Sequence, residues 1–344
     1  MKNADSFFKK TPFIIAEMSG NHNQSLDRAL QIVKAAADAG AHAIKLQTYT
    51  ANTMTLNMEE GAFKITDPNS LWYGRNLYEL YEEAHTPWEW HKEIFDFAHS
   101  LGLMAFSTPF DETAVDFLES LGVKAYKIAS FENTDEPLLI KVAQTGKPVI
   151  MSTGAATLSD IDFAVHTLRA HGCSDLTLLK CTSTYPASPE NTNLLTIPHL
   201  RELFDCNVGL SDHTMGIGVS VASVALGATI IEKHFTLSRA DGGVDSAFSI
   251  EPAELKSLVI ECERAYLALG KVSYGVHKAE EKSLIYKRSI YVAKDIQKGE
   301  AFTLNNLRVV RPGDGLPSKF LKNIIGKPAR NDIKSGTPLS WDLL

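Results

Sequence analysis

The sequence is organised by eight short apolar runs, each followed by a stretch with helical periodicity. Such runs are typical of strands that are buried on both faces of a parallel sheet. Eight strand and helix pairs in series, with no strand-rich interruption, predict a closed (β/α)8 TIM barrel rather than an open doubly wound sheet. The predicted strands are Phe13–Met18, Ala43–Gln47, Leu103–Ser107, Ala125–Ala129, Pro148–Ser152, Leu176–Cys181, Val208–Ser211 and Thr229–His234.

Active sites of such barrels lie at the carboxyl ends of the strands, so the polar residues there form a candidate site. Two lysines and several hydroxyl groups, in a chain of net charge −7, indicate a local anion site for a phosphate or a carboxylate. A buried lysine could instead be a Schiff-base nucleophile, as in barrel aldolases, although such a lysine works alone in an apolar pocket. The strand-end residues are Glu17, Lys45, Gln47, Ser107, Thr108, Lys127, Ser130, Ser152, Thr153, Thr182, Ser183, Ser211, His213, Glu232 and His234.

Two of these residues, His213 and His234, end successive predicted strands. Parallel neighbouring strands place both imidazoles on the same rim, beside Asp212 and Glu232. Neutral imidazoles are good ligands, so the pair is a candidate site for one divalent cation. The alternative is that each histidine is a satisfied polar residue in a loop.

One connection, residues 48–87, is much longer than the others and is rich in aromatic residues, among them Trp72, Tyr73, Tyr78 and Tyr81. A loop of this length on the catalytic rim is typically a lid or a substrate wall. It could also be an excursion that packs on the barrel.

The C-terminal residues differ from the barrel in composition and contain an internal repeat. Asp295-Ile296, followed by Gly299, recurs as Asp332-Ile333, followed by Gly336. This repeat predicts a small pseudo-symmetric β-rich module. We therefore divide the chain into a barrel (1–274), a charged linker (275–288) and the module (289–344). Arg311 heads a glycine-rich loop between the repeats, so the module is either a lid that carries Arg311 into a site or a dimerisation tag.

Composition excludes several classes of protein. A pI near 5.9 gives no basic face for nucleic acid. Residues 1–6 lead into an apolar run of only a few residues, so we expect neither a signal peptide nor a membrane span. Four widely spaced cysteines without a CxxC pair indicate reduced thiols, and we expect the protein to stay in the cytosol.

Six segments at or near the predicted strand ends form recognisable motifs: Phe13–Asn23, Lys127–Glu132, Ser152–Gly154, Cys181–Pro186, Ser211–Thr214 and Glu232–Thr236. These motifs resemble those of the sialic acid synthase family along nearly the whole chain, and the C-terminal repeat resembles the antifreeze-like (SAF) domain of that family. Four further segments look most like the pseudaminic acid synthase branch: Leu46–Thr50, Leu71–Tyr78, Thr86–His91 and Ser238–Gly243.

The resemblance implies condensation of phosphoenolpyruvate with an open-chain N-acyl amino sugar and water, releasing phosphate and a nine-carbon 2-keto sugar acid. For this branch the sugar is 2,4-diacetamido-2,4,6-trideoxy-altrose and the product is pseudaminic acid, a component of bacterial surface glycans, including glycosylated flagellin. N-Acetylneuraminate and legionaminate synthases are the alternatives. A Schiff-base aldolase and a non-catalytic carbohydrate-binding protein are more distant ones.

The resemblance also implies roles for individual residues. His213 and His234 hold a divalent cation (Mn, Mg or Co), and Glu17 is the best candidate for the base that takes a proton from water. Ser183 stands where the sialic acid branch has Asn, although a serine can still donate to phosphate. Contacts to phosphoenolpyruvate are implied for Lys45, Thr108, Lys127, Ser130, Ser152, Ser183 and Ser211, and contacts to the sugar for Gln47, Glu132, Tyr185, Asp245 and Arg311.

The family further implies a homodimer in which each C-terminal module caps the barrel of the other subunit. Arg311 of one subunit would then enter the active site of its partner.

Overall fold

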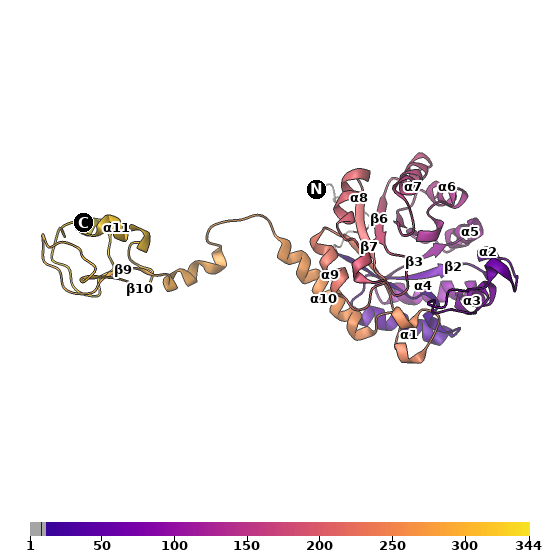
Figure 1. The fold of residues 1–344 in the computed structure, drawn as a ribbon. Helices are drawn as coiled ribbons and strands as arrows, with labels where there is room; N and C mark the ends of the chain where they lie inside the picture. Colours follow the sequence, from indigo (N-terminus) through magenta and orange to yellow (C-terminus); the bar gives the residue numbers. More distant parts are fainter. Residues whose placement is uncertain (1–7, 9–11) are drawn as a thin grey trace. The chain divides into compact units, whose positions relative to one another are not determined.

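The computed structural model describes residue 8 and residues 12–344 and contains a closed barrel of eight parallel strands (Figure 1). Each strand pairs with the next one along the chain, and pairing of the eighth with the first closes the barrel. The predicted fold class is therefore confirmed. The strands are β1 (Phe13–Glu17), β2 (Ala43–Thr48), β3 (Met104–Pro109), β4 (Tyr126–Ile128), β5 (Val149–Ser152), β6 (Leu176–Cys181), β7 (Asn207–Ser211) and β8 (Ile230–His234).

Helices surround the strands (Figure 1), and several begin at a capping side chain. The side chains of Ser25, Asp111 and Thr157 accept hydrogen bonds from backbone N–H groups of the first turn. These caps fix where α1, α5 and α7 begin, and so where the preceding loops meet the rim. The helices that follow the strands are α1 (Leu26–Ala39), α4 (His91–Ser100), α5 (Glu112–Ser120), α6 (Glu136–Gln144), α7 (Leu158–Ala170), α8 (Thr196–Phe204), α9 (Gly218–Ala225) and α10 (Pro252–Leu269).

The long connection after β2 contains two short helices, α2 (Ala51–Met54) and α3 (Leu77–Ala84). The part between them folds back on itself, because Lys64 and Asn76 form an antiparallel bridge. This segment is therefore an ordered hairpin-like excursion between the second strand and α4.

The interior of the barrel is filled at its amino end by a separate apolar cluster. Apart from Phe8, which precedes β1, its members come from alternate positions along the strand segments, as expected when successive side chains point in and out. On β7 the corresponding position is Gly209, where a Cβ would overlap with the carbonyl oxygen of Ile230. The cluster consists of Phe8, Phe13, Ile15, Ala43, Phe106, Ala125, Ile150, Leu179 and Ile230.

The C-terminal residues 271–344 form a second compact unit with its own apolar core. It contains the antiparallel strands β9 (Ser289–Val292) and β10 (Leu307–Val310) and the short helix α11 (Leu321–Ile324). The repeat has a structural role: Ile296 and Ile333 exchange reciprocal backbone hydrogen bonds of 2.8 Å. Part of the segment expected as a linker, Lys278–Tyr286, forms a 3-10 helix.

Within the described residues, no helix is both long enough and apolar enough to cross a bilayer. Residues 1–6, on which the expectation about a signal peptide rests, lie outside the described part.

Candidate active site

Directly above the apolar cluster, each of the eight strands contributes one buried side chain to a ring. Every member lies two residues after a position of the layer below and therefore points into the barrel. The ring has two lysines, two carboxylates, three hydroxyls and one thiol. Its members are Glu17, Lys45, Thr108, Lys127, Ser152, Cys181, Ser211 and Glu232.

Two lysines and two carboxylates of the ring lie close to one another. Lys45 forms an ion pair with Glu17, and its Nζ lies 3.9 Å from Glu232 Oε1. Lys127 Nζ lies 3.7 Å from the same Glu232 oxygen. Hydroxyl groups complete the network: Lys45 Nζ donates to Thr108 Oγ1 (3.0 Å) and Lys127 Nζ to Ser152 Oγ (2.7 Å).

Burial and these pairs set the protonation of the ring. Burial raises the pKa of Glu17, against the opposing effect of Lys45. Burial also lowers the pKa of Lys127. Burial alone would raise the pKa of Glu232, but the positive charges of Lys127 and Lys45 outweigh it, so this pKa is lowered. Glu17 is thus the carboxyl group more disposed to accept a proton.

Ser130 and Ser183, both expected to bind phosphate, lie together around Gly154, which follows β5. The Gly154 N–H donates to Ser130 Oγ at 3.1 Å. A Cβ on Gly154 would overlap with the Ser183 hydroxyl and lie 2.7 Å from Ser130 Oγ. A residue without a side chain is therefore needed for the two hydroxyls to converge.

The rings of His213 and His234 lie face to edge, with centroids 5.3 Å apart. His213 Nδ1 lies 3.0 Å from the Thr182 carbonyl oxygen, and because a carbonyl can only accept, Nδ1 donates to it and Nε2 is the nitrogen left to bind a metal. Burial alone would lower the pKa of His213, but the contact with Cys181 raises it. Burial lowers the pKa of His234, whose buried Nδ1 has no hydrogen-bond partner in the described residues. When both rings are neutral, one nitrogen of each is free to bind the expected divalent cation.

Asp212 does not belong to this site, which corrects the reading that placed it beside the histidines. Its carboxylate pairs with Lys233 (3.0 Å) and accepts from Ser220 and Thr214. Because side chains alternate along a strand, Asp212 and Lys233 face away from the barrel interior, whereas their neighbours face into it. Among the described residues, no group of three or more His, Cys, Asp or Glu side chains is gathered around a metal position.

The candidate sugar residues of the barrel lie on the same rim. Tyr185 packs against His213, with ring centroids 4.4 Å apart, and Asp245 Oδ2 lies 3.9 Å from His234 Nδ1. Gln47 follows Lys45 by two residues on β2 and shares its inward face. Burial raises the pKa of Glu132 to about 7.

Arg311 is exposed in the C-terminal unit and heads a loop that is held in place by its neighbours. Ser289 Oγ donates to the Pro312 carbonyl (2.7 Å), and the Gly313 N–H donates to the Ile285 carbonyl (2.9 Å). The described structure brings the barrel residues of the candidate site together, whereas the role of Arg311 stays a prediction.

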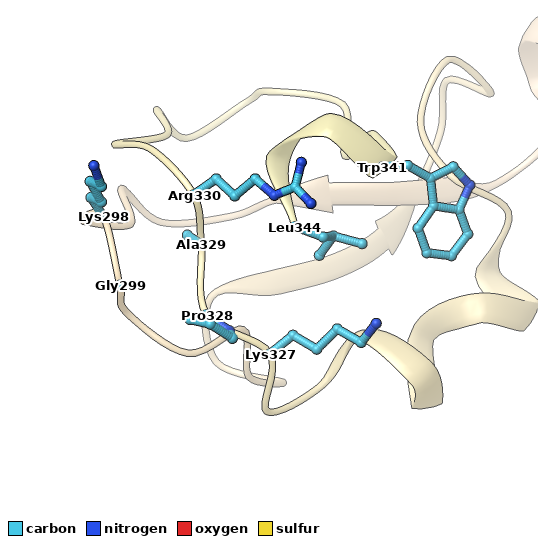
Figure 2. A pocket seen from close by; sticks show the side chains of 8 residues that line it. All are labelled: Lys298, Gly299, Lys327, Pro328, Ala329, Arg330, Trp341 and Leu344. Atoms are coloured by element: carbon cyan, nitrogen blue, oxygen red, sulfur yellow. The ribbon is translucent and has the colours of Figure 1, made fainter.

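The same unit has a cavity of about 650 Å³ that does not include Arg311. Figure 2 shows Arg330 and Lys327 extending toward the side of this cavity where Trp341 and Leu344 lie. The residues that line this cavity are therefore different from those of the Arg311 loop.

One ring member, Cys181, is not among the site residues expected from the sequence, whereas Glu232 is expected at its strand end but without a role in the ring. Cys181 Sγ lies 3.9 Å from His213 Nδ1, and although burial opposes it, this contact lowers the pKa of the thiol to about 7. The alternation of inward positions could have identified Cys181, since it follows the inward residue Leu179 by two residues.

Comparison with known proteins agrees with this geometry. Residues 32–274 match the NeuB family model, and residues 287–344 match the SAF domain model. A pseudaminic acid synthase of Helicobacter pylori is 46% identical over 96% of this chain and 97% of its own length. An N,N'-diacetyllegionaminic acid synthase of Campylobacter jejuni is 38% identical over 95% of this chain and 98% of its own length.

Among solved structures, an N-acetylneuraminic acid (sialic acid) synthetase from Leptospira borgpetersenii, in complex with citrate, matches with a TM-score of 0.71. It is 33% identical, and the match covers 80% of this chain and 91% of that one. The family model alone spans well over half of the sequence. Together with the barrel, the buried ring and the histidine pair, these matches show that the chain belongs to the NeuB family of sialic acid synthases.

Proposed function

We propose that this protein condenses phosphoenolpyruvate with 2,4-diacetamido-2,4,6-trideoxy-altrose and water, giving pseudaminic acid and phosphate. The reaction class is supported by the buried ring of two lysines and two carboxylates. The serines around Gly154 and the histidine pair lie next to this ring. The observation that favours this sugar is the higher identity to the pseudaminic acid synthase than to the legionaminic acid synthase.

Phosphoenolpyruvate suits the ring because it brings a carboxylate and a phosphate close together. Lys45 and Lys127 are buried and already held by hydroxyl groups, so their charges are positioned before the substrate binds. The hydroxyl groups of Ser130 and Ser183 supply further donors for the phosphate, and the Gly154 N–H positions Ser130 by donating to its Oγ.

The reaction joins C3 of phosphoenolpyruvate to the aldehyde carbon of the sugar, whose C=O bond becomes a C–OH group by uptake of one proton, while water adds to C2. Glu17 takes the proton of that water, which its raised pKa favours. The negative charge of bound phosphoenolpyruvate near Glu17 strengthens this tendency. The tetrahedral intermediate then breaks its C–O bond to phosphate, leaving the 2-keto acid.

His213 and His234 would hold the divalent cation, which when bound acts as a Lewis acid toward the sugar aldehyde. The protein itself orients this end of the site. Thr182 fixes the tautomer of His213 through its carbonyl, and Tyr185 packs against the same ring. Asp245, held by Ser19, and Glu132 are in position to bind hydroxyl or amide groups of the sugar.

We also propose that the enzyme works as a domain-exchanged homodimer in which Arg311 reaches the sugar in the partner barrel. Charge supports docking of the module on a barrel, and the family resemblance favours the barrel of the partner. Residues 271–344 carry 14 Lys and Arg but 7 Asp and Glu, a net charge of +7, whereas residues 1–270 carry 20 and 34, a net charge of −14. A cationic module is attracted to an anionic barrel at long range.

We propose that the enzyme acts in the bacterial cytosol, where thiols stay reduced. Cys181 is a free thiol inside the site, and an oxidising compartment would put it at risk. The product would serve surface glycans, including those of flagellin.

The decisive assay measures phosphate release from phosphoenolpyruvate with the trideoxy sugar and with the precursors of legionaminate and N-acetylneuraminate. We expect the trideoxy sugar to be preferred, and turnover to stop in chelator and return when a divalent metal is added. His213→Ala and His234→Ala should each abolish turnover, because one imidazole is a poor cation site. Full activity of either variant in chelator would contradict the metal assignment.

The same assay separates the alternative chemistry. A Schiff-base aldolase would be trapped by borohydride on Lys45 or Lys127 in the presence of pyruvate, and it would ignore chelator. A purely carbohydrate-binding protein would bind sugar without releasing phosphate.

A further inference from the structure

Trp72 connects the long excursion after β2 to the candidate sugar residues. Its indole Nε1 donates to the Val244 carbonyl at 3.0 Å, next to Asp245. Its ring centroid lies 6.1 Å from that of Tyr185. The flanking residues Leu71 and Tyr73 are 49% and 60% exposed, whereas Trp72 is half-buried. Trp72 is thus the residue of this turn that packs against the rim.

The aromatic contacts form a cluster around the histidines, and Trp72 lies at its outer edge. The ring centroid of Tyr185 lies 4.4 Å from that of His213, and the ring centroid of Phe248 lies 5.2 Å from that of Tyr185 and 5.0 Å from that of His234. Trp72 reaches this cluster through Tyr185, one ring further from the histidines. If the aldehyde carbon binds at the histidines, Trp72 is therefore on the side of the far end of a six-carbon open chain.

We propose that Trp72 is a specificity-determining residue whose indole ring forms an apolar wall for the terminal methyl group of the 6-deoxy sugar. This inference rests on the proposed function and adds a substrate contact to it. The indole has one polar group, its N–H, and that group is already bound to the Val244 carbonyl. A terminal hydroxyl would therefore meet the indole ring without a hydrogen-bond partner, and a buried unpaired hydroxyl is costly.

The size of the effect follows from the chemistry of apolar pockets. Such a pocket rejects an added hydroxyl by roughly 10–100-fold, because it offers no specific repulsion beyond the lost hydration. Trp72 should therefore act mainly on binding of the sugar and little on the chemical step.

The test compares kcat/KM for the trideoxy sugar and for its 6-hydroxy analogue in the wild type, Trp72→Ala and Trp72→Phe. We expect Trp72→Ala to lose about 10-fold in kcat/KM for the 6-deoxy sugar, mostly through KM, and to lose much less for the 6-hydroxy analogue. Trp72→Phe keeps an apolar ring and should retain most of the preference. Tyr73→Ala is the matched control and should behave like the wild type, because Tyr73 is exposed.

An equal loss for both sugars in Trp72→Ala would overturn the proposal and leave Trp72 only a positioning role for the excursion. An unchanged preference would also overturn it. Failure of the proposed function can be distinguished from failure of the Trp72 proposal, because in the first case the wild type would release no phosphate with the trideoxy sugar. If the wild type prefers another amino sugar, the same ratio is measured with the 6-deoxy and 6-hydroxy forms of that sugar.

Discussion

At the scale of single residues, Glu17 is the side chain whose environment is most closely matched to a chemical role. It is buried, its pKa is raised by burial, and it is paired with Lys45. Glu17→Gln should keep the shape and the hydrogen bond to the Ser19 N–H, but it removes the base. We expect kcat to fall by about 10²–10⁴-fold while phosphoenolpyruvate binding, measured by calorimetry, changes little. Loss of binding with near-normal turnover would assign Glu17 a structural role.

A second prediction at this scale concerns Glu132, whose pKa is raised from 4.5 to about 7, mainly by burial. Between these two values the folded protein binds more protons than the unfolded chain, so this group makes stability fall as pH rises through that window. Glu132→Gln should remove this contribution, which is about 1–3 kcal/mol between pH 5 and pH 8.

Denaturant unfolding of both proteins at the two pH values measures the Glu132 effect. Tryptophan fluorescence is a suitable probe, because Trp72, Trp88 and Trp90 all lie in the barrel unit. The groups that act on this carboxyl are Lys127, which opposes the shift, and Asp135, which adds to it. Equal pH dependence in the wild type and the variant would contradict the assignment.

At the scale of elements, the turn that follows β5 depends on Gly154. Gly154→Ala should displace the hydroxyls of Ser183 and Ser130, because the added Cβ overlaps with the first and crowds the second. We expect KM for phosphoenolpyruvate to rise by about 10-fold or more, the cost of roughly one lost charged hydrogen bond, while the protein still folds. Gly218→Ala is the control, since a Cβ there meets no heavy atom within 4 Å. A normal KM in Gly154→Ala would remove this turn from the phosphate site.

The strands also show how far the sequence predicts this structure. All eight were found from apolar runs, with ends that differ by a few residues, as for β4, which spans Tyr126–Ile128 rather than 125–129. The sequence predicts where the strands lie better than it predicts which way individual side chains point. Asp212 was grouped with the histidines by proximity in sequence, although the alternation along β7 turns it outward to Lys233. The contact of Trp72 could not be predicted, because a loop has no periodicity that fixes where its side chains point.

At the scale of the whole molecule, the open question is which barrel receives Arg311. The C-terminal unit is small, cationic and joined to the barrel by a short segment, so it could cap its own barrel or that of a partner. In a two-fold dimer with exchanged modules, each active site takes Glu17 from one subunit and Arg311 from the other. In a closed monomeric arrangement, both residues come from the same chain.

Mixing two inactive variants, Glu17→Gln and Arg311→Ala, distinguishes the two arrangements. With exchanged modules, a mixed dimer has one barrel with Glu17 that is capped by a module with Arg311, and its second site has both defects. If subunits mix at random in equal amounts, half of the dimers are mixed and half of their sites are intact, so activity should return to about a quarter of the wild-type value. Subunit exchange is verified independently with differently tagged chains. No recovery after verified exchange would show that Arg311 acts over its own barrel or outside the site, because every site would then keep one defect.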